Sequence, residues 1–183
     1  MIGSVRPQRI CPQIAGWVAE VGRGRGPWSL EMVDLRDWLL PMDDETEMPQ
    51  RGLYANAHTQ AWSAKVAAAD AIVFVTPQYN WGYPAVLKNA LDHLYQEWAG
   101  KPALIVTYGG HGGSKCAGQL RMVLEGLKMV PVATMPALVL SRQRIEANSG
   151  EVRPAAEFAQ HLPALEQAFI ELAAALASSA RLT

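Results

Sequence analysis

The sequence contains three short segments whose side chains are suited to binding an anionic, planar ligand. The first loop, Gly3–Arg9 (GSVRPQR), combines a glycine, a hydroxyl and two guanidinium groups just before a predicted helix. Backbone N–H groups at a helix N-terminus and a nearby hydroxyl can surround a phosphate, and guanidinium suits a phosphate dianion better than ammonium does. We therefore predict a phosphate site at Ser4, Arg6 and Arg9, with a solvated loop carrying unrelated arginines as the alternative.

The other two segments offer flat surfaces. The second loop, Pro77–Pro84 (PQYNWGYP), places amide and aromatic side chains directly after the most apolar run of the chain. The third loop, Gly109–Ser114 (GGHGGS), is rich in glycine, which lets the backbone approach a ligand closely. Core aromatics and a merely flexible turn are the respective alternatives. Together the three loops suit a phosphate attached to a planar heterocycle.

Alternating strands and helices must position these loops. Apolar runs predict strands at Leu30–Leu35, Ala71–Thr76, Ala103–Tyr108 and Val132–Leu140, of which the second and third are nearly continuous in apolar residues. Apolar residues at three-to-four spacing predict helices at Ile10–Val21, Ala55–Ala69, Ala85–Tyr95, Lys115–Lys128 and Ala155–Ser179, the last kinked or split at Pro163. This alternation predicts an α/β fold with a parallel sheet, in which ligands bind at the carboxyl ends of the strands.

Two strand positions are unusual. Pro131 and Pro136 lie beside and within Val132–Leu140, so we expect an edge strand, because proline cannot donate to a ladder on both sides. The first loop follows only Met1 and Ile2, although it should leave the end of a central strand. The first strand is therefore apparently missing or truncated, and we expect residues upstream of Met1. Arg36–Tyr54 is predicted to be a long ordered loop, and Ser141–Pro154 a surface excursion.

Composition limits the classes of function. The 183 residues suit one domain, residues 1–183, and the formal net charge of −1 gives no basic field for nucleic acid. No apolar run approaches the roughly 18 residues of a membrane span, and no signal peptide precedes the first loop. Two cysteines, Cys11 and Cys116, suit a cytoplasmic protein with reduced thiols that pack as small apolar groups.

Four motifs span nearly the whole chain and resemble those of the NADPH-dependent FMN reductase family, which has the flavodoxin-like fold. They are GSVRPQR, Leu40-Pro41, TPQYNWGYPAVLKNALDHL and YGGHGG. The resemblance implies a doubly wound parallel sheet of order 2-1-3-4-5. It also implies that Ser4, Arg6 and Arg9 hold the phosphate and ribityl end of FMN. The isoalloxazine would then lie between two sets of residues: Pro77, Gln78, Tyr79 and Asn80, and Gly109, Gly110, His111 and Gly112. Gln78 replaces an acidic residue usual in the family.

By this resemblance the protein is an FMN-dependent NAD(P)H oxidoreductase. It would use NADPH or NADH as co-substrate and reduce a small-molecule acceptor such as a quinone, an azo compound, a metal oxyanion or free flavin. No side chain is expected to act as nucleophile. A homodimer or homotetramer is implied, with Trp81, Tyr83 and the loop at Trp38–Met48 at the interface. The alternative is a flavodoxin-like electron carrier, or a module that has lost its flavin and binds a partner.

Other motifs do not support a different chemistry. GRGRG at 22–26 follows a helix and precedes a strand, the wrong order for dinucleotide binding. GGSKC at 112–116 has Cys116 where a nucleophile elbow needs glycine, and no aspartate follows Ser114. The histidines show no metal-binding spacing, so we expect no metal site, and His93 is expected to form a helix-surface pair with Asp92. The histidines are His58, His93, His111 and His161.

Overall fold

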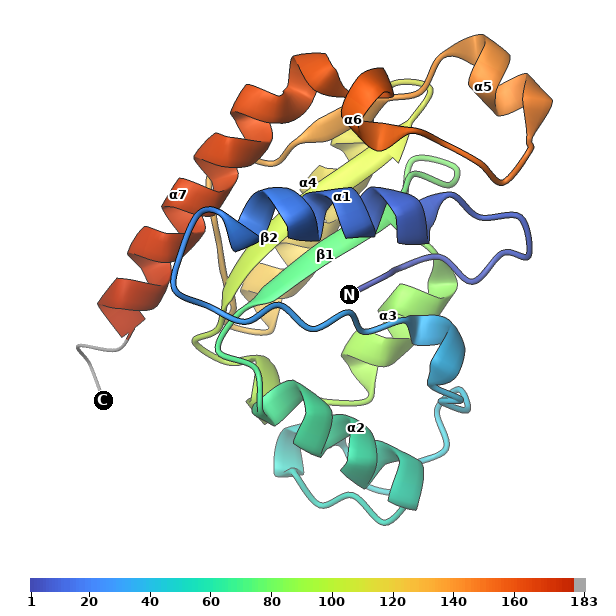
Figure 1. The fold of residues 1–183 in the computed structure, drawn as a ribbon. Helices are drawn as coiled ribbons and strands as arrows, with labels where there is room; N and C mark the ends of the chain where they lie inside the picture. Colours follow the sequence, from blue (N-terminus) through green and yellow to red (C-terminus); the bar gives the residue numbers. More distant parts are fainter. Residues whose placement is uncertain (180–183) are drawn as a thin grey trace.

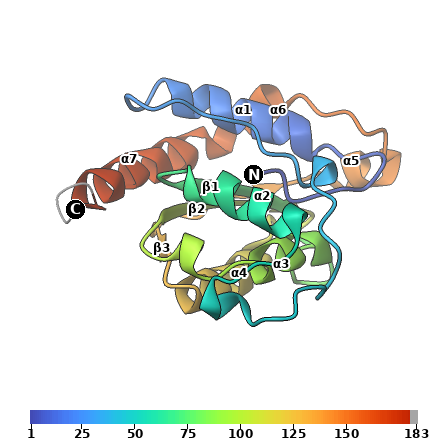
Figure 2. The ribbon, with the colours of Figure 1, turned by 90° about the horizontal axis from the view of Figure 1, so that it is seen from below.

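The computed structural model describes residues 1–179 as a three-layer α/β fold. A parallel sheet forms the middle layer, as Figure 1 and Figure 2 show from two directions. Helices α1 (Cys11–Arg23) and α7 (Leu162–Ser179) cover one face. Helices α2 (Ala57–Ala67), α3 (Ala85–Asp92) and α4 (Ser114–Gly126) cover the other. The α/β class predicted from the sequence is confirmed.

The sheet is built around one long strand. Strand β1 (Ile72–Pro77) pairs in parallel with strand β2 (Pro102–Gly109) along the whole length of β1, from Ile72 opposite Ala103 to Pro77 opposite Tyr108. On its other side, β2 pairs first with β3 (Val130–Pro131) and then with β4 (Ala137–Val139). Of the predicted edge strand Val132–Leu140 only Ala137–Val139 is formed, and β3 lies just before its predicted start. The prolines lack the N–H groups that a continuous ladder needs.

The predicted strand Leu30–Leu35 is wrong. This segment forms only an isolated bridge at Asp34, and a short 3-10 helix, η1 (Leu35–Asp37), begins directly afterwards. Its neighbour is Ile2, which bridges to Asp34 on one side and to Val75 of β1 on the other. Ile2 donates its N–H to the Val33 carbonyl at 2.8 Å, and Leu35 donates to the Ile2 carbonyl at 3.3 Å. Met1 and Gly3 also form backbone hydrogen bonds to Val73 and Val75 of β1. Only isolated bridges result, so the four strands do not establish the order 2-1-3-4-5.

The remaining elements are short. The predicted helix at Ala155–Ser179 is split into α6 (Pro154–Glu157), η4 (Ala159–His161) and α7. Pro163 lies in the first turn of α7, where a missing N–H costs nothing. Residues 36–54 are a loop with a 3-10 turn, η2 (Pro49–Arg51), and α5 (Arg142–Ala147) lies in the predicted surface excursion. A last 3-10 turn, η3 (Gln96–Trp98), follows α3.

Two apolar cores stabilise the sheet, one on each face. Alternate residues of β2 serve both: Leu104 and Val106 pack with α1 and α7, whereas Ala103 and Ile105 pack with α2, α3 and α4. In the second core the buried Trp62 donates its indole N–H to the Ala90 carbonyl at 2.8 Å, which ties α2 to α3. None of the helices within residues 1–179 is long and apolar enough to cross a membrane.

His93 does not form the surface pair that the sequence suggested. Only 6% of the residue is exposed, and its Nδ1 lies 2.8 Å from the Asn89 carbonyl rather than beside Asp92. Asp92 instead pairs with Lys88 one turn earlier on the exposed side of α3. The prediction failed because α3 ends at Asp92, and His93 turns inward as its C-cap.

Candidate functional site

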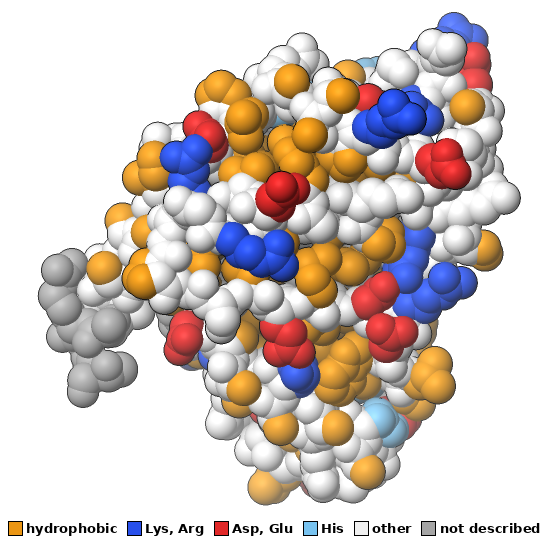
Figure 3. Space-filling view, viewed as in Figure 1, with side chains coloured by type: hydrophobic (Ala, Val, Ile, Leu, Met, Phe, Trp, Pro, Cys, Tyr) orange, Lys and Arg blue, Asp and Glu red, His pale blue; other side chains and the backbone are white. Residues whose placement is uncertain are grey.

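A cleft of about 260 Å³ lies at the carboxyl ends of β1 and β2, where the sequence predicted a ligand. It brings together eight of the eleven residues predicted for the cofactor: Ser4, Arg6, Arg9, Pro77, Gln78, Tyr79, Gly109 and Gly110. Asn80, His111 and Gly112 do not line it. Figure 3 shows basic side chains with acidic ones beside them toward the right of this face, where Figure 1 draws the first loop and η1.

The first loop lies close against the end of β1. A Cβ atom on Gly3 would be 2.9 Å from the Thr76 hydroxyl oxygen, so only glycine allows this approach. The next residue, Ser4, is 1% exposed, and its hydroxyl lies 3.0 Å from the Tyr79 hydroxyl. Arg6 lies over the Tyr79 ring, with its guanidinium carbon 3.9 Å from the ring centroid. The first and second loops are therefore joined at the cleft, as a common ligand would require.

Arg9 makes a bidentate pair with a residue that sequence reasoning missed. Its two terminal nitrogens donate to the Asp34 carboxylate at 2.6 Å and 2.5 Å, and one also donates to the Ser4 carbonyl at 2.5 Å. Burial would raise the pKa of Asp34, but hydrogen bonds from Arg9 and the Arg36 backbone N–H outweigh it and lower the pKa. Arg9 therefore fixes the first loop to the segment around Asp34. In the sequence Asp34 stood out only as one of two acidic residues, with Glu31, in a predicted strand.

The second loop is a tight hairpin-like turn. Tyr79 and Gly82 exchange backbone hydrogen bonds at 2.8 Å and 2.9 Å, and Asn80 and Trp81 between them have φ values of 48° and 71°. Asn80 and Trp81 are exposed at the tip of this turn, outside the cleft. The side chain of Gln78 has a different role: its Oε1 accepts a hydrogen bond at 3.1 Å from the Cys116 N–H in the first turn of α4. An acceptor at position 78 therefore caps a helix as well as lining the cleft.

The third loop divides into two halves. Gly109 and Gly110 line the cleft, and a Cβ on Gly110 would be 3.1 Å from the Ile145 side chain. Gly112 and Gly113 have φ values of 72° and 94° and pack against β4 and β2. A Cβ on Gly112 would be 2.8 Å from the Ala137 carbonyl oxygen. The first two glycines therefore allow close approach to the cleft, whereas the last two allow the loop to pack against the sheet.

Residues 141–151 cover one side of the cleft, which the sequence did not predict. Arg144, Ile145 and residues 148–151 line it, and Asn148 and Gly150 adopt positive φ in the turn after α5. This turn contacts the first loop and α1: Gln13 Nε2 donates to the Gly150 carbonyl at 3.2 Å. Arg144 pairs with Glu157 at 2.7 Å, which fixes α5. The polar composition indicated only a surface segment, because its contacts are with distant residues.

The residues of the cleft are compatible with FMN. Two guanidinium groups and the buried hydroxyl of Ser4 form a donor set for a phosphate, next to the N-terminus of the 13-residue helix α1. Pro77, Tyr79 and the side-chain-free Gly109 and Gly110 provide flat walls. The cysteines are not suited to redox chemistry here: both are free and buried, and burial raises the pKa of Cys116 to about 12.

The same fold occurs in known flavoenzymes. The structure matches FerB, a flavoenzyme NAD(P)H:(acceptor) oxidoreductase from Paracoccus denitrificans, with a TM-score of 0.70 at 21% identity over 94% of this chain and 93% of FerB. Flavodoxin-like α/β architecture is therefore the class to which the fold belongs.

Sequence comparison identifies the family. The sequence profile of NADPH-dependent FMN reductases matches residues 1–141. An NAD(P)H-dependent FMN reductase of Schizosaccharomyces pombe is 56% identical over 173 residues, covering 93% of this chain and 86% of that protein. A second one, of Saccharomyces cerevisiae, is 49% identical over 74% of this chain and 82% of its own length. A quinone reductase of Escherichia coli is 34% identical over 62% of this chain and 63% of that protein. The chain belongs to the NADPH-dependent FMN reductase family.

Proposed function

We propose that this protein is an FMN-dependent NAD(P)H oxidoreductase that passes reducing equivalents from NADPH or NADH to a small-molecule acceptor. The observation that carries the proposal is the cleft in which the first, second and third loops meet, in a chain that belongs to the FMN reductase family. Quinones are the first acceptors to test, because a quinone reductase is among the relatives. Azo compounds, metal oxyanions and free flavin are further candidates.

The phosphate end of the cofactor is assigned to the first loop. Arg6 is exposed and is held by the Tyr79 ring rather than by a carboxylate, so its guanidinium is the freer of the two to bind a phosphate. Arg9 already uses three of its N–H groups on Asp34 and the Ser4 carbonyl. Arg9 lines the cleft, and two of its five N–H groups are left for a ligand there. Ser4 adds a hydroxyl from a buried position.

The ring end is assigned to the second and third loops. When bound, FMN supplies the capacity to accept and donate hydride. The protein positions it: Pro77 and Tyr79 form one wall, and Gly109 and Gly110 allow the backbone to approach the other. Backbone N–H groups of these loops would stabilise negative charge where it develops. Asn80, His111 and Gly112 remain candidates that would need to move toward the cleft.

The proposal extends to the assembly and the sheet. The strand order 2-1-3-4-5 is supported by the isolated bridges of Ile2 to Asp34 and to Val75, because a first strand in that order would have the same two neighbours. A homodimer or homotetramer is supported by exposed apolar side chains on the predicted interface segments: Leu39 is 87% exposed, Met42 71% and Trp81 64%.

The reduced, buried cysteines support a cytoplasmic location.

Titration with FMN and a turnover assay at saturating FMN test the assignment together. Each charge-assisted hydrogen bond to a phosphate is worth about 1.5–3 kcal/mol, so Arg6→Ala and Arg9→Ala should weaken FMN binding by roughly ten- to a hundredfold. Turnover with NADPH and a quinone at saturating FMN should stay within a few-fold of the parent. Asn80→Ala should change turnover more than FMN affinity. Full FMN affinity in both arginine variants would mean that the first loop is not the phosphate site.

A further inference from the structure

A second cleft, of about 220 Å³, lies away from the proposed flavin site and has a strongly acidic lining. The two clefts share no lining residue among those described. Five of its lining residues carry carboxylates: Asp43, Asp44, Glu45, Glu47 and Asp92. No lysine or arginine is among its described lining residues, although Arg51 and Lys88 pair with Glu47 and Asp92 at its rim. This local excess of negative charge favours cations.

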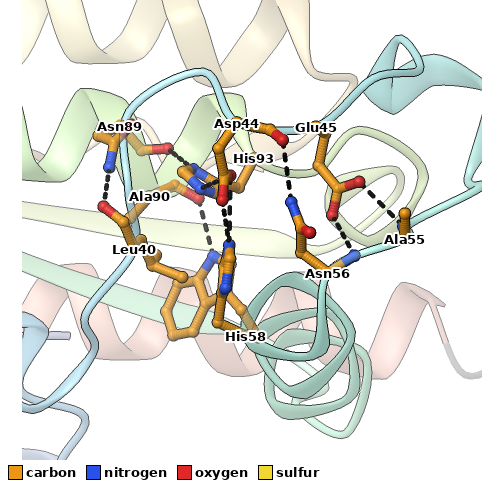
Figure 4. Close-up of polar contacts among 10 residues, drawn as sticks. Leu40, Asp44, Glu45, Ala55, Asn56, His58, Asn89, Ala90 and His93 are labelled. Atoms are coloured by element: carbon orange, nitrogen blue, oxygen red, sulfur yellow. Dashed lines mark hydrogen bonds and ion pairs between the residues drawn. The ribbon is translucent and has the colours of Figure 1, made fainter.

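Three side chains from separate elements lie close together, as Figure 4 shows, and two of them, Asp44 and His93, line this cleft. Asp44 belongs to the long loop before α2, His58 to the first turn of α2, and His93 is the C-cap of α3. One ligand atom from each, a carboxylate oxygen or an imidazole nitrogen, lies within 4.8 Å of the other two. Two imidazoles and a carboxylate are ligands that transition metals prefer.

The buried histidine presents a lone pair to this position. The Nδ1 atom of His93 lies 2.8 Å from the Asn89 carbonyl, which can only accept a hydrogen bond, so Nδ1 carries the proton. In the neutral ring Nε2 is therefore unprotonated. The His93 side chain is only 4% exposed, and this buried nitrogen has no hydrogen-bond partner among the described residues. Water is therefore largely excluded from an atom that still needs a partner. A ring N–H donated to a backbone carbonyl is the usual arrangement behind a metal-bound histidine.

The Asp44 carboxylate faces His93 Nε2 at a distance that suits two ligands of one ion better than a direct hydrogen bond. Asp44 Oδ1 is 3.8 Å from His93 Nε2, too far for a hydrogen bond. Two atoms bound to one tetrahedral metal ion at about 2.0–2.2 Å each are roughly 3.3–3.6 Å apart, so a shift of a few tenths of an ångström would let both bind one ion. Both oxygens of the Asp44 carboxylate also contact His58 Nε2, Oδ2 at 2.9 Å and Oδ1 at 3.2 Å. Asp44 therefore lies between the two imidazole rings.

Neighbouring contacts hold this arrangement in place. The Asp44 carbonyl accepts a hydrogen bond from Asn56 Nδ2 at 2.9 Å. The Glu45 carboxylate accepts the backbone N–H groups of Ala55 and Asn56 at 2.9 Å and 3.0 Å, so it anchors the loop to the start of α2 and is not itself a ligand. The loop that carries Asp44 is therefore fixed before any ion binds.

We propose that Asp44, His58 and His93 form a binding site for a divalent transition metal ion, with Zn²⁺ as the type species. Three protein ligands leave a coordination position for water from the acidic cleft, as in open zinc sites. The ion would tie the loop before α2 to both α2 and α3. The sequence led us to expect no metal site, because the histidines show no metal-binding spacing. The three proposed ligands are far apart in the sequence and come together only in the folded chain.

The proposal is tested by titrating the purified protein with Zn²⁺ alone and measuring the heat of binding by calorimetry. The parent should bind one ion per chain. Removing a partner behind a metal ligand typically costs 10–100-fold in affinity, so loss of a ligand itself in Asp44→Asn or His58→Asn should weaken binding at least tenfold. His161 lies in η4 and is not part of the cluster, so His161→Asn should bind Zn²⁺ as the parent does. Titration with Co²⁺ should give visible d–d absorption in the parent and lose it in both ligand variants.

The partly exposed Asp44 and His58 decide the question, since His93→Asn risks unfolding the end of α3. Circular dichroism should show that Asp44→Asn and His58→Asn are folded. The proposal is overturned if the parent shows no saturable Zn²⁺ binding, or if both variants bind Zn²⁺ as tightly as the parent. The alternative, in which Asp44 and His58 only hydrogen-bond to each other and hold no ion, predicts no saturable Zn²⁺ binding by the parent. Because the readout is metal affinity, it is independent of FMN binding and turnover.

Discussion

Arg9 and Asp34 form a bidentate ion pair that links the first loop to the segment after α1, with nitrogen–oxygen distances of 2.6 Å and 2.5 Å. The Arg9 side chain is 9% exposed and that of Asp34 18%. The pair stands beside Ile2, whose backbone hydrogen bonds join the same two segments. Side chains therefore supply at this point part of the cohesion that a full strand would give.

Replacing Asp34 should destabilise the fold. Asp34→Asn keeps the shape but removes the charge, leaving the Arg9 guanidinium without its counterion in a mostly buried position. We expect the free energy of unfolding to fall by about 1.5–3 kcal/mol, the usual contribution of hydrogen bonds to charged groups. Urea unfolding measures this. Arg25→Ala, which breaks the exposed pair with Glu166, is the control and should cost at most about 1 kcal/mol. Equal losses in the two variants would contradict the assignment.

The same pair should make stability depend on pH in the acid range. The pKa of Asp34 is lowered in the folded protein from an ordinary value of 3.8, so the unfolded chain takes up its proton first as the pH falls. The contribution of Asp34 is complete above pH 3.8 and is lost as the pH falls through the lowered folded pKa. Urea midpoints measured downward from neutral pH should fall less steeply in Asp34→Asn than in the parent. Parallel curves would show that Asp34 does not titrate abnormally.

Gly3 and Gly16 form a matched pair for testing the tight approach of the first loop to β1. A Cβ on Gly3 meets the buried Thr76 side chain, and the Val75 carbonyl oxygen lies 3.2 Å away, so neither neighbour can yield cheaply. Gly3→Ala should cost about 1–3 kcal/mol, as overpacking does. Gly16 lies within α1, and a Cβ added there would meet no other part of the fold within 4 Å, so Gly16→Ala should stabilise by about 0.5–1 kcal/mol. Thermal unfolding should shift in opposite directions for the two variants.

Gln78 should be replaceable by glutamate but not by alanine. Its Oε1 satisfies the Cys116 N–H in the first turn of α4. Gln78→Ala removes that acceptor and should cost about 0.5–2 kcal/mol, as loss of a helix cap does. Gln78→Glu keeps an acceptor and adds negative charge near a helix N-terminus, so it should be neutral or stabilising. Chemical denaturation compares the three proteins, and equal destabilisation by both substitutions would rule out the capping role.

The sequence predicted the parts of the fold whose signal is local. The apolar runs that became β1 and β2 have ordinary strand composition, and their bounds agree with the structure to within one residue at each end. The prolines at 131 and 136 likewise gave the edge position of the fourth predicted strand, because the absence of a donor is a property of the residue itself. The cleft followed from these strands, since ligand loops leave their carboxyl ends.

Features that depend on contacts between distant segments could not be predicted. Leu30–Leu35 was predicted from its apolar residues, yet it forms only an isolated bridge to Ile2, so its surroundings decide its conformation. Asp34 acquires its role only because Arg9 lies opposite it. Residues 141–151 cover the cleft through contacts with Gln13 and the first loop, and nothing in their own sequence specifies these contacts.

The broken edge of the sheet has a further consequence, because side chains already occupy several of its backbone groups. Arg121 donates to the Val132 carbonyl at 2.9 Å, the Glu171 carboxylate accepts the Thr134 N–H at 2.8 Å, and His161 accepts the Val139 N–H at 3.4 Å. An open edge with free donors and acceptors invites another chain to add a strand, which leads to aggregation or domain swapping. Here three side chains occupy backbone groups of that edge, which disfavours the addition of a strand from another chain past β3 and β4.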